Sequence, residues 1–281
     1  MSQEAPLIVS ISGIRGLVDQ SLTNEVVARF AAAFGTTLPP DSTVILARDT
    51  RPSGENFARV AATALSRTGC RVIDLGKCST PGAKLLVTEL GAQGAIVITA
   101  SHNPAPWNGL KLIRADGIFL NATEGKRVEA LFHSGQFRQA PPGDIETPDA
   151  DEVKTRHLQR ILAHVDTEAI RRARFNVAVD PCNGAGALLI PDLLASLGVK
   201  ATFINAEANG DFAHEPEPIP ANLMQLGQAV RDNKCAVGFA IDPDADRVTL
   251  VGADGEAGHA DGGADRRRVQ GRQRRPVRLG H

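Results

Sequence analysis

GAIVITASHNPAPWNGLKL, residues 94–112, is the stretch from which the fold can be worked outward. Its first seven residues, GAIVITA, form an apolar run, which predicts a strand buried on both faces. The strand ends at Ser101 and His102, and the prolines and Asn-Gly that follow predict a rigid loop. Across that loop Lys111 can come back beside Ser101, and GLKLI (109–113) and GIFL (117–120) predict a hairpin-like pair of strands.

Strands and helices alternate on either side of this stretch. The expected strands cover residues 7–12, 43–47 and 70–76, and the expected helices cover residues 23–38, a segment ending near residue 66, and residues 80–90. SGIRG (12–16) is expected to be a turn after the first strand. Alternating strands and helices predict a sheet that is covered on both faces.

A segment rich in proline and acidic residues, QAPPGDIETPDADE (139–152), predicts a linker between two such series. The second series is expected to contain helices at residues 152–172, before residue 197 and at 221–232, and strands at 176–180, 200–205, 235–241 and 248–252. We therefore expect an α/β protein of two consecutive three-layer α/β/α domains, residues 1–145 and 146–257, with mixed, mostly parallel sheets. A disordered basic C-terminal tail, residues 258–281, is expected to follow.

Composition narrows the class of protein. Of the 281 residues, 42% are hydrophobic and 22% charged, which is typical of a soluble globular protein. The N-terminus lacks the pattern of a signal peptide, and no apolar run approaches the ~20 residues that span a bilayer. The four cysteines form neither a CxxC nor a zinc pattern, so we expect free thiols in a reducing cytoplasm.

DPDADR (242–247) follows a predicted apolar strand and contains three alternating carboxylates, Asp242, Asp244 and Asp246. Three carboxylates that converge on one point would repel one another unless a cation neutralised them. A hard divalent cation is the natural partner, and Mg²⁺ fits best where phosphate is handled. The alternatives are an acidic turn and a calcium loop, although the glycine and distal glutamate of a calcium loop are missing.

The role of Ser101 is ambiguous when only the neighbouring sequence is considered. A serine after a buried strand often caps the next turn, and neither a hydrolase triad nor a GxSxG elbow accompanies it. Lys111 nearby would nevertheless suit a phosphorylated serine. PCNGAG (181–186) is interpreted as a tight strand-to-helix turn, and His157 and His164 as members of a solvated helix face.

Taken together, these motifs resemble those of the α-D-phosphohexomutases, the family of phosphoglucomutase, phosphomannomutase and phosphoglucosamine mutase. TASHNP with NGLK is similar to the family's phosphoserine loop and DPDADR to its magnesium loop. SGIRG and ARDTRPSG (47–54) are similar to its two N-terminal signatures. The resemblance covers about residues 7–257.

The resemblance implies an intramolecular phosphotransferase of carbohydrate metabolism, in the isomerase class. It would interconvert hexose 6-phosphate and hexose 1-phosphate through a phosphoserine and a hexose 1,6-bisphosphate, with Mg²⁺ as cofactor and a phosphorylated hexose as partner. The implied catalytic residues are Ser101, Lys111, Arg15 and His102, the implied substrate-binding residue is Arg247, and the implied metal ligands are Ser101, Asp242, Asp244 and Asp246.

The sequence departs from the family after about residue 257. Family members have four domains, and we expect domains III and IV to be absent here. Residues 258–281 contain seven Arg and two Asp, a net charge of +5. A frameshift product is favoured over a genuine flexible tail, and a nucleic-acid-binding arm is not expected. The alternative function is therefore a truncated, catalytically incompetent Mg²⁺-binding fragment. The sequence leaves the hexose and the oligomeric state open.

Overall fold

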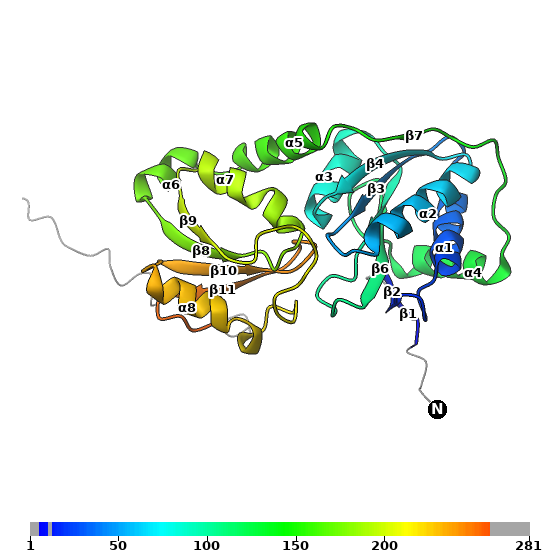
Figure 1. Cartoon of the computed structure of the whole chain (residues 1–281). Helices are drawn as coiled ribbons and strands as arrows, with labels where there is room; N and C mark the ends of the chain where they lie inside the picture. The colour runs from blue at the N-terminus through cyan, green and yellow to red at the C-terminus, as the bar shows by residue number, and fades with distance from the viewer. Residues whose placement is uncertain (1–5, 11–12, 259–281) are drawn as a thin grey trace, which may run out of the picture.

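The computed structural model of the chain describes residues 6–10 and 13–258. Two β-sheets with helices on their faces make up this part of the chain (Figure 1). Both sheets combine parallel with antiparallel pairs, which confirms the expected mixed α/β class. From residue 259 onward the expected basic tail lies outside the described residues, as does Ser12 of SGIRG.

Within the described residues, the first sheet has seven strands in the order β1-β2-β6-β5-β3-β4-β7. Their bounds are β1 Ile8–Ser10, β2 Gly13–Leu17, β3 Thr43–Arg48, β4 Arg71–Lys77, β5 Gly94–Ile98, β6 Trp107–Arg114 and β7 Ile145–Glu146. Strands β5, β3, β4 and β7 run parallel, whereas β6, β2 and β1 are added antiparallel at the other edge. Every residue of β5 is buried, as its apolar sequence predicts.

Helices cover both faces of this sheet. One face carries α1 Asn24–Thr37, α2 Gly54–Arg67 and α4 Ala122–Ser134, and the other carries α3 Thr80–Glu89 and α5 Ala150–Leu162. Phe30, Phe34 and Phe57 fill the first of the two cores, while Leu86 and Val153 belong to the second. Because side chains alternate along each strand, the same strands supply both cores, and the sheet is fixed from both sides.

The second sheet has the strand order β11-β10-β8-β9 in the described part of the chain. Its strands are β8 Asn176–Asp180, β9 Lys200–Phe203, β10 Val237–Ile241 and β11 Val248–Gly252. Helix α8, Met224–Asp232, packs on one face through Leu226 and Val230. On the other side lie α6 Thr167–Ala173 and α7 Ile190–Ser196, and two short 3-10 helices, η1 Ala185–Leu188 and η2 Pro220–Asn222, complete the element order (Figure 1).

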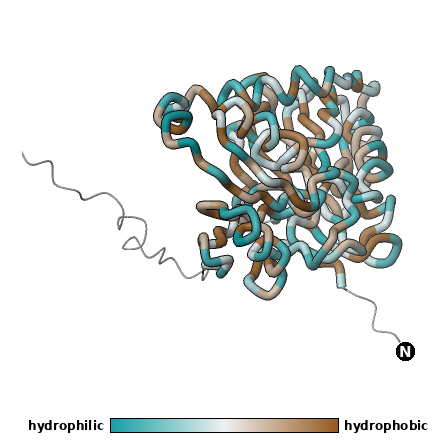
Figure 2. Tube along the Cα trace, turned by 60° about the vertical axis from the view of Figure 1, so that its left-hand side comes forward, coloured by the Kyte–Doolittle hydropathy of each residue, from teal (hydrophilic) through white to brown (hydrophobic). Residues whose placement is uncertain are grey.

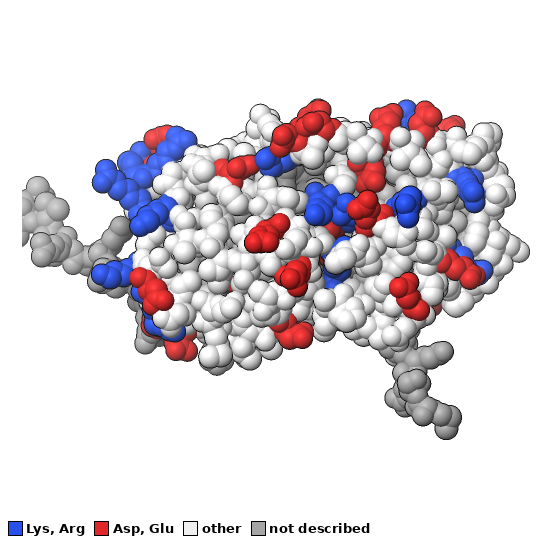
Figure 3. Space-filling model, in the orientation of Figure 1, with Lys and Arg blue, Asp and Glu red and all other residues white. Residues whose placement is uncertain are grey.

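Polarity is distributed as expected for such layers. In Figure 2 much of the hydrophilic trace lies along the rim, and hydrophobic stretches run through the interior. Figure 3 shows acidic and basic side chains scattered over one face, with Lys and Arg gathered at the end of α6, where Arg171, Arg172 and Arg174 lie. That face has no continuous basic stripe of the kind that follows a nucleic-acid backbone.

Three local expectations were wrong, the first being that GIFL is a strand, since it forms only an isolated bridge from Phe119 to Ile113. The described part of SGIRG, residues 13–16, is not a turn, because Gly13–Leu17 forms β2 and pairs antiparallel with β6. Glycine-rich sequence is typical of turns, but here it lets neighbouring strands approach: a Cβ on Gly13 would lie 2.5 Å from Leu110 O of β6. The expected helix 152–172 is instead two helices, because the Asp166 side chain accepts a hydrogen bond from Ala169 N and starts a new helix, α6.

The carboxyl ends of strands from both sheets meet at one junction. Ser101 follows β5, Asp242 follows β10, and Ser101 Oγ donates a hydrogen bond to Asp242. The first residue of α3, Thr80, donates its backbone N–H to Asp244 O at 2.9 Å. Loops at the carboxyl edge of a parallel sheet are where open α/β folds place their binding groups, and here two such edges meet.

Candidate functional site at the junction of the two sheets

Ser101 lies three residues beyond the end of β5 and is 1% exposed. Its backbone φ of +52° is in the left-handed region, which few residues other than glycine adopt. The side-chain Oγ donates to Asp242 Oδ2 over 2.8 Å. A serine from the first sheet therefore meets a carboxylate from the second.

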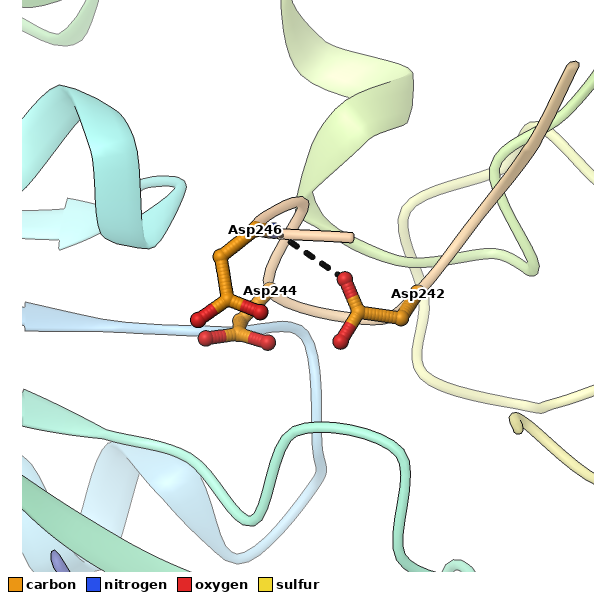
Figure 4. A group of neighbouring side chains, drawn as sticks. All are labelled: Asp242, Asp244 and Asp246. Carbon is orange, nitrogen blue, oxygen red and sulfur yellow. Dashed lines mark hydrogen bonds between the residues drawn. The ribbon is translucent and has the colours of Figure 1, made fainter. Parts of the chain in front are cut away.

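Three aspartates form a compact group directly after β10 (Figure 4). Asp242 Oδ1 accepts hydrogen bonds from the backbone N–H groups of Asp246 and Arg247, each at 3.0 Å, and these bonds curl the loop back on itself. One carboxylate oxygen from each of Asp242, Asp244 and Asp246 lies within 4.8 Å of the others. Two of the three, Asp242 and Asp244, are fully buried. The alternation of the carboxylates in DPDADR thus produces one convergent cluster.

Lys111 enters the same cluster from β6. The antiparallel register pairs Lys111 with Val97 of β5, so the lysine lies beside the strand that leads to Ser101. Its Nζ donates to Asp244 Oδ2 at 2.6 Å and to Asp246 Oδ2 at 2.5 Å. Because the lysine is almost completely buried, these ion pairs are formed away from bulk water, where charge interactions are strong.

Burial and mutual repulsion separate the acidities of the carboxyls. Burial, together with the charges of Asp244 and Asp246, raises the pKa of Asp242 to about 7. Burial also acts to raise the pKa of Asp244, but the charge and hydrogen bond of Lys111 outweigh it and lower that pKa. Burial acts to lower the pKa of Lys111, and the two carboxylates it contacts raise it above its usual value. Lys111 therefore stays protonated.

The donor set fits a hard divalent cation. Asp244 Oδ1 is buried and has no hydrogen-bond partner in the described structure, although the other oxygen of the same carboxylate accepts bonds from Lys111 and the Thr80 hydroxyl. An unpartnered buried oxygen is costly unless something binds it. Carboxylate and hydroxyl oxygens from Asp242, Asp244, Asp246 and Ser101 are ligands that such cations take.

Three further cationic or ionisable residues predicted for the site lie around Ser101. Arg15 Nη1 donates to Asn103 Oδ1 at 3.1 Å, and burial and the nearby Arg247 lower the pKa of Arg15. The ring of His102 has its Nε2 4.0 Å from Glu217 Oε1, and its buried Nδ1 has no partner among the described residues. Burial and Arg247 lower the pKa of His102. Arg247 itself is exposed.

Residues that had no predicted role also contribute. Thr80 bonds to Asp244 through both its backbone N–H and its hydroxyl, although in the sequence it was only the start of a helix. Asn103, two residues after Ser101, accepts a hydrogen bond from Arg15. Glu217, from the segment FAHEPEPIP (212–220), faces His102. The three prolines of that segment were the one feature of the sequence that could have drawn attention to Glu217.

PCNGAG forms a tight turn that supports the aspartate loop. Cys182 N donates to Asp180 Oδ1, and Ala185 N donates to Pro243 O at 2.7 Å. A Cβ on Gly184 would lie 2.6 Å from Pro243 Cα, so only glycine fits at this approach.

The prediction that His157 and His164 share a solvated face was half wrong. His164 is exposed, but His157 is about half-buried, and burial lowers its pKa. The reason is that α5 packs beside α3 on one face of the first sheet, where His157 lines a cavity together with Ser79 and Lys77.

Within residues 6–10 and 13–258, no helix has both the length and the apolar character that crossing a membrane requires.

Two family models match the chain. Residues 7–139 match "Phosphoglucomutase/phosphomannomutase, alpha/beta/alpha domain I", and residues 155–255 match domain II of the same family.

Curated relatives have related names. A phosphoglucosamine/phosphogalactosamine mutase of Sulfurisphaera tokodaii is 35% identical over 246 residues, covering 86% of this chain and 54% of the relative. A phosphoglucomutase/phosphomannomutase of Thermococcus kodakarensis is 37% identical over 248 residues, with the same two coverages. The chain thus spans about half the length of the curated relatives it matches.

Solved structures agree with this similarity. A crystal structure from Thermus thermophilus, assigned as a phosphomannomutase, is 29% identical and superposes with a TM-score of 0.81 over 91% of this chain and 59% of that one. A phosphoglucomutase/phosphomannomutase family protein from Burkholderia thailandensis is 25% identical, with a TM-score of 0.75 over 89% of this chain and 56% of that one.

Proposed function

This chain belongs to the phosphoglucomutase/phosphomannomutase family, the α-D-phosphohexomutases, and from that membership we propose that it acts in the interconversion of hexose 6-phosphate and hexose 1-phosphate. In this proposal Ser101 carries the transferable phosphoryl group, residues 1–145 serve as domain I and residues 146–257 as domain II. The observation that supports it most is the 2.8 Å hydrogen bond between Ser101 Oγ and Asp242 Oδ2. That bond joins the predicted carrier in one half of the chain to the predicted metal ligands in the other.

The proposed chemistry is a pair of phosphoryl transfers. Ser101 Oγ forms a bond to one phosphorus of a hexose 1,6-bisphosphate, the bond from that phosphorus to the sugar oxygen breaks, and the sugar oxygen takes the proton. In the reverse direction the phosphoryl group passes from Ser101 to the hydroxyl at carbon 1 or carbon 6 of a hexose monophosphate. When Ser101 gives its phosphoryl group to the hydroxyl at one carbon and then takes back the phosphoryl group from the other carbon, one hexose monophosphate has been converted into the other.

The chain's own charges suit these transfers, which depend on positioning and on neutralising charge. Two carboxylates hold Lys111 Nζ and raise its pKa, so this group stays protonated. It therefore places a positively charged proton donor beside the reacting phosphate. Arg15 and His102 lie close to Ser101, and the exposed guanidinium of Arg247 is free to contact a phosphate of the substrate.

Asp242, Asp244, Asp246 and the oxygen of Ser101 are the residues that would hold Mg²⁺. When bound there, Mg²⁺ supplies positive charge to the phosphate oxygens. The buried, unpartnered Asp244 Oδ1 supports this assignment from the structure itself.

The substrate class is a phosphorylated hexose. The names of the two curated relatives refer to glucosamine, galactosamine, glucose and mannose phosphates, so their similarity supports the class and leaves the individual sugar open. A hexose 1,6-bisphosphate is the proposed activator.

The test is a mutase assay on the purified full chain with Mg²⁺, glucose 1-phosphate and glucose 1,6-bisphosphate, repeated with the mannose and glucosamine phosphates. We expect isomerisation that Ser101→Ala abolishes and that Ser134→Ala, on the exposed end of α4, leaves unchanged. Isomerisation that survives Ser101→Ala would contradict the proposal. Phosphorylation of Ser101 without isomerisation would instead identify a phosphoryl-carrying, metal-binding unit that does not turn over.

A further inference from the structure

Arg51, in the motif ARDTRPSG, has no role in the site described so far. It follows β3, is 1% exposed, and is the largest fully buried side chain among the described residues. All five of its side-chain N–H donors have acceptors. Nε donates to Asp49 Oδ2 at 3.1 Å, Nη1 donates to Pro104 O and Trp107 O at 2.8 Å each, and Nη2 donates to Ser101 O at 2.8 Å and Asn103 O at 2.6 Å.

Four of these five acceptors are backbone carbonyls of one short segment, residues 101–107, which we call the serine loop. A guanidinium presents its donors in a fixed plane, so carbonyls that bind all of them are held in a fixed arrangement. A lysine at this place could bond to some of the carbonyls but could not hold the same four in one plane. The shape of the serine loop therefore depends on the guanidinium of Arg51.

A second series of hydrogen bonds connects Arg51 to the backbone N–H of Ser101. Asp49 accepts from Arg51 through both carboxylate oxygens, and its Oδ2 also accepts from Thr99 Oγ1 at 2.6 Å. Thr99 Oγ1 in turn accepts from Ser101 N at 2.9 Å. Both the N–H and the C=O of Ser101 are thus fixed by one buried network that begins at Arg51.

This network holds an unfavourable backbone conformation. Ser101 has a φ of +52°, which a non-glycine residue keeps only where its surroundings determine it. The conformation directs Oγ toward Asp242 in the second half of the chain. If the serine loop relaxed, this direction would be lost first.

The second half of the chain closes over the same guanidinium. The ring centroid of Phe212 lies 4.9 Å from Arg51 Cζ, and the neighbouring Thr50 donates its hydroxyl to Asn183 O at 2.9 Å. Water is therefore kept from the bonds between Arg51 and the serine loop.

We propose that Arg51 is a positioning residue, which sets the serine loop in the shape that presents Ser101 Oγ for phosphoryl transfer. The inference about loop shape stands on the structure, and only its kinetic consequence rests on the proposed function. Arg51 contacts neither the phosphate nor the metal in this account, and it acts through the backbone of residues 101–107.

Arg51→Lys is the test variant, because it keeps the charge beside Asp49 and removes the planar donor set. Arg138→Lys is the matched control. Arg138 also donates to several backbone carbonyls, those of Gly35, Leu38, Pro39 and Thr68, and none of these belongs to the serine loop. Two measurements are made on each full-length chain: amide hydrogen exchange of peptides covering residues 100–107, and the rate at which Ser101 takes phosphate from glucose 1,6-bisphosphate.

In Arg51→Lys we expect exchange of the serine-loop amides to rise at least ~10-fold while exchange in β3 and β5 is unchanged, a local opening. We expect the phosphorylation rate at saturating bisphosphate to fall by ~100-fold, the cost of a misplaced reacting group. Arg138→Lys should leave both readings as in wild type. If Arg51→Lys fails to fold, Thr99→Val, which cuts the bond to Ser101 N, is expected to act in the same direction.

Unchanged exchange in the serine loop of Arg51→Lys, or equal loss of rate in Arg51→Lys and Arg138→Lys, would overturn the proposal. If wild-type Ser101 takes no phosphate at all, the proposed function fails, and the hydrogen-exchange comparison still decides whether Arg51 shapes the loop.

Discussion

Lys111 Nζ lies 2.6 Å from Asp244 Oδ2, although Lys111 belongs to β6 of the first sheet and Asp244 to the loop after β10 of the second. The two halves of the chain therefore meet through an almost fully buried ion pair. Asp246 accepts from the same ammonium at 2.5 Å, and Asp242, which accepts from Ser101, completes the group of three carboxylates. One ammonium cannot neutralise three carboxylates, so the cluster favours either a proton on Asp242 or a bound cation.

The first prediction is that Mg²⁺ stabilises the folded chain. A ligand that binds only the folded state at 100 times its Kd adds about 2.7 kcal/mol to the free energy of unfolding. Thermal unfolding of the wild type in increasing Mg²⁺ should show a rising Tm, and Asp244→Asn should lose most of this rise. Asp41→Asn is the control, because Asp41 is exposed and asparagine tolerates its left-handed backbone. An equal rise in Asp244→Asn would contradict the metal site.

The second prediction concerns Lys111. Lys111→Met keeps the length of the side chain but removes the ammonium that donates to Asp244 and Asp246. Breaking a buried pair by removing one partner costs about 3–5 kcal/mol, so we expect a loss of that order without metal. Because Mg²⁺ would then replace the positive charge that Lys111 supplied to Asp244 and Asp246, its stabilising effect should be larger than in wild type.

Lys126→Met, at an exposed position of α4, is the control for the second prediction and should change stability by less than about 0.5 kcal/mol. A Lys111→Met protein that is as stable as wild type in the absence of Mg²⁺ would show that the ion pairs are not formed in solution.

The third prediction contrasts two glycines. A Cβ on Gly109 of β6 would lie 2.2 Å from Ile14 O and 2.8 Å from Thr99 O, so Gly109→Ala must push strands apart beside the serine loop. We expect a loss above about 2 kcal/mol by urea unfolding. Gly125→Ala, in α4 with nothing within 4 Å, should instead stabilise by about 0.5–1 kcal/mol. Similar changes in the two variants would refute the close approach at Gly109.

The fourth prediction is a pH dependence from His214. Its Nε2 lies 3.0 Å from Asp180 Oδ2 and its Nδ1 2.8 Å from Glu215 O, and the hydrogen bond to Asp180 raises its pKa above 6.5. A raised histidine pKa gives stability that is fully present below the unfolded-state pKa and is lost as the pH rises through the folded-state pKa.

Wild type should therefore exceed His214→Gln in stability at about pH 5, by under about 1 kcal/mol after solvent screening, and the difference should shrink above neutral pH. His164→Gln, at an exposed position, should show no such trend when thermal unfolding is followed across the same range. A difference that grows with rising pH would have the wrong sign and would exclude a protonated His214.

The strands that lead to the site could be predicted from the sequence because each is marked by its own apolar residues. The apolar run before Ser101 and the one before Asp242 each end where the structure ends a strand, within a few residues. A buried strand must be apolar along its length, and it must stop where polar groups begin. The three alternating aspartates of DPDADR likewise needed no distant partner to be recognised as a convergent group.

The contacts that build the site could not be read in the same way. Thr80 and Asp244 are 164 residues apart, and nothing near either residue in the sequence indicates the other. Arg51 was visible only as part of a motif, since its acceptors are backbone carbonyls that leave no mark on residue type. SGIRG was mistaken for a turn because glycine serves both turns and close strand approach, and only the neighbouring strand decides between them.

The most direct test of the central claim, that Ser101 carries the phosphoryl group, is to map phosphate on the chain itself. The purified protein is incubated with Mg²⁺ and glucose 1,6-bisphosphate, and intact mass and peptide mass spectrometry locate the modification. We expect one added phosphoryl group, on Ser101, that is absent from Ser101→Ala and present in Ser134→Ala. Phosphate on any other residue, or an unmodified Ser101 in a chain that isomerises hexose phosphates, would contradict it.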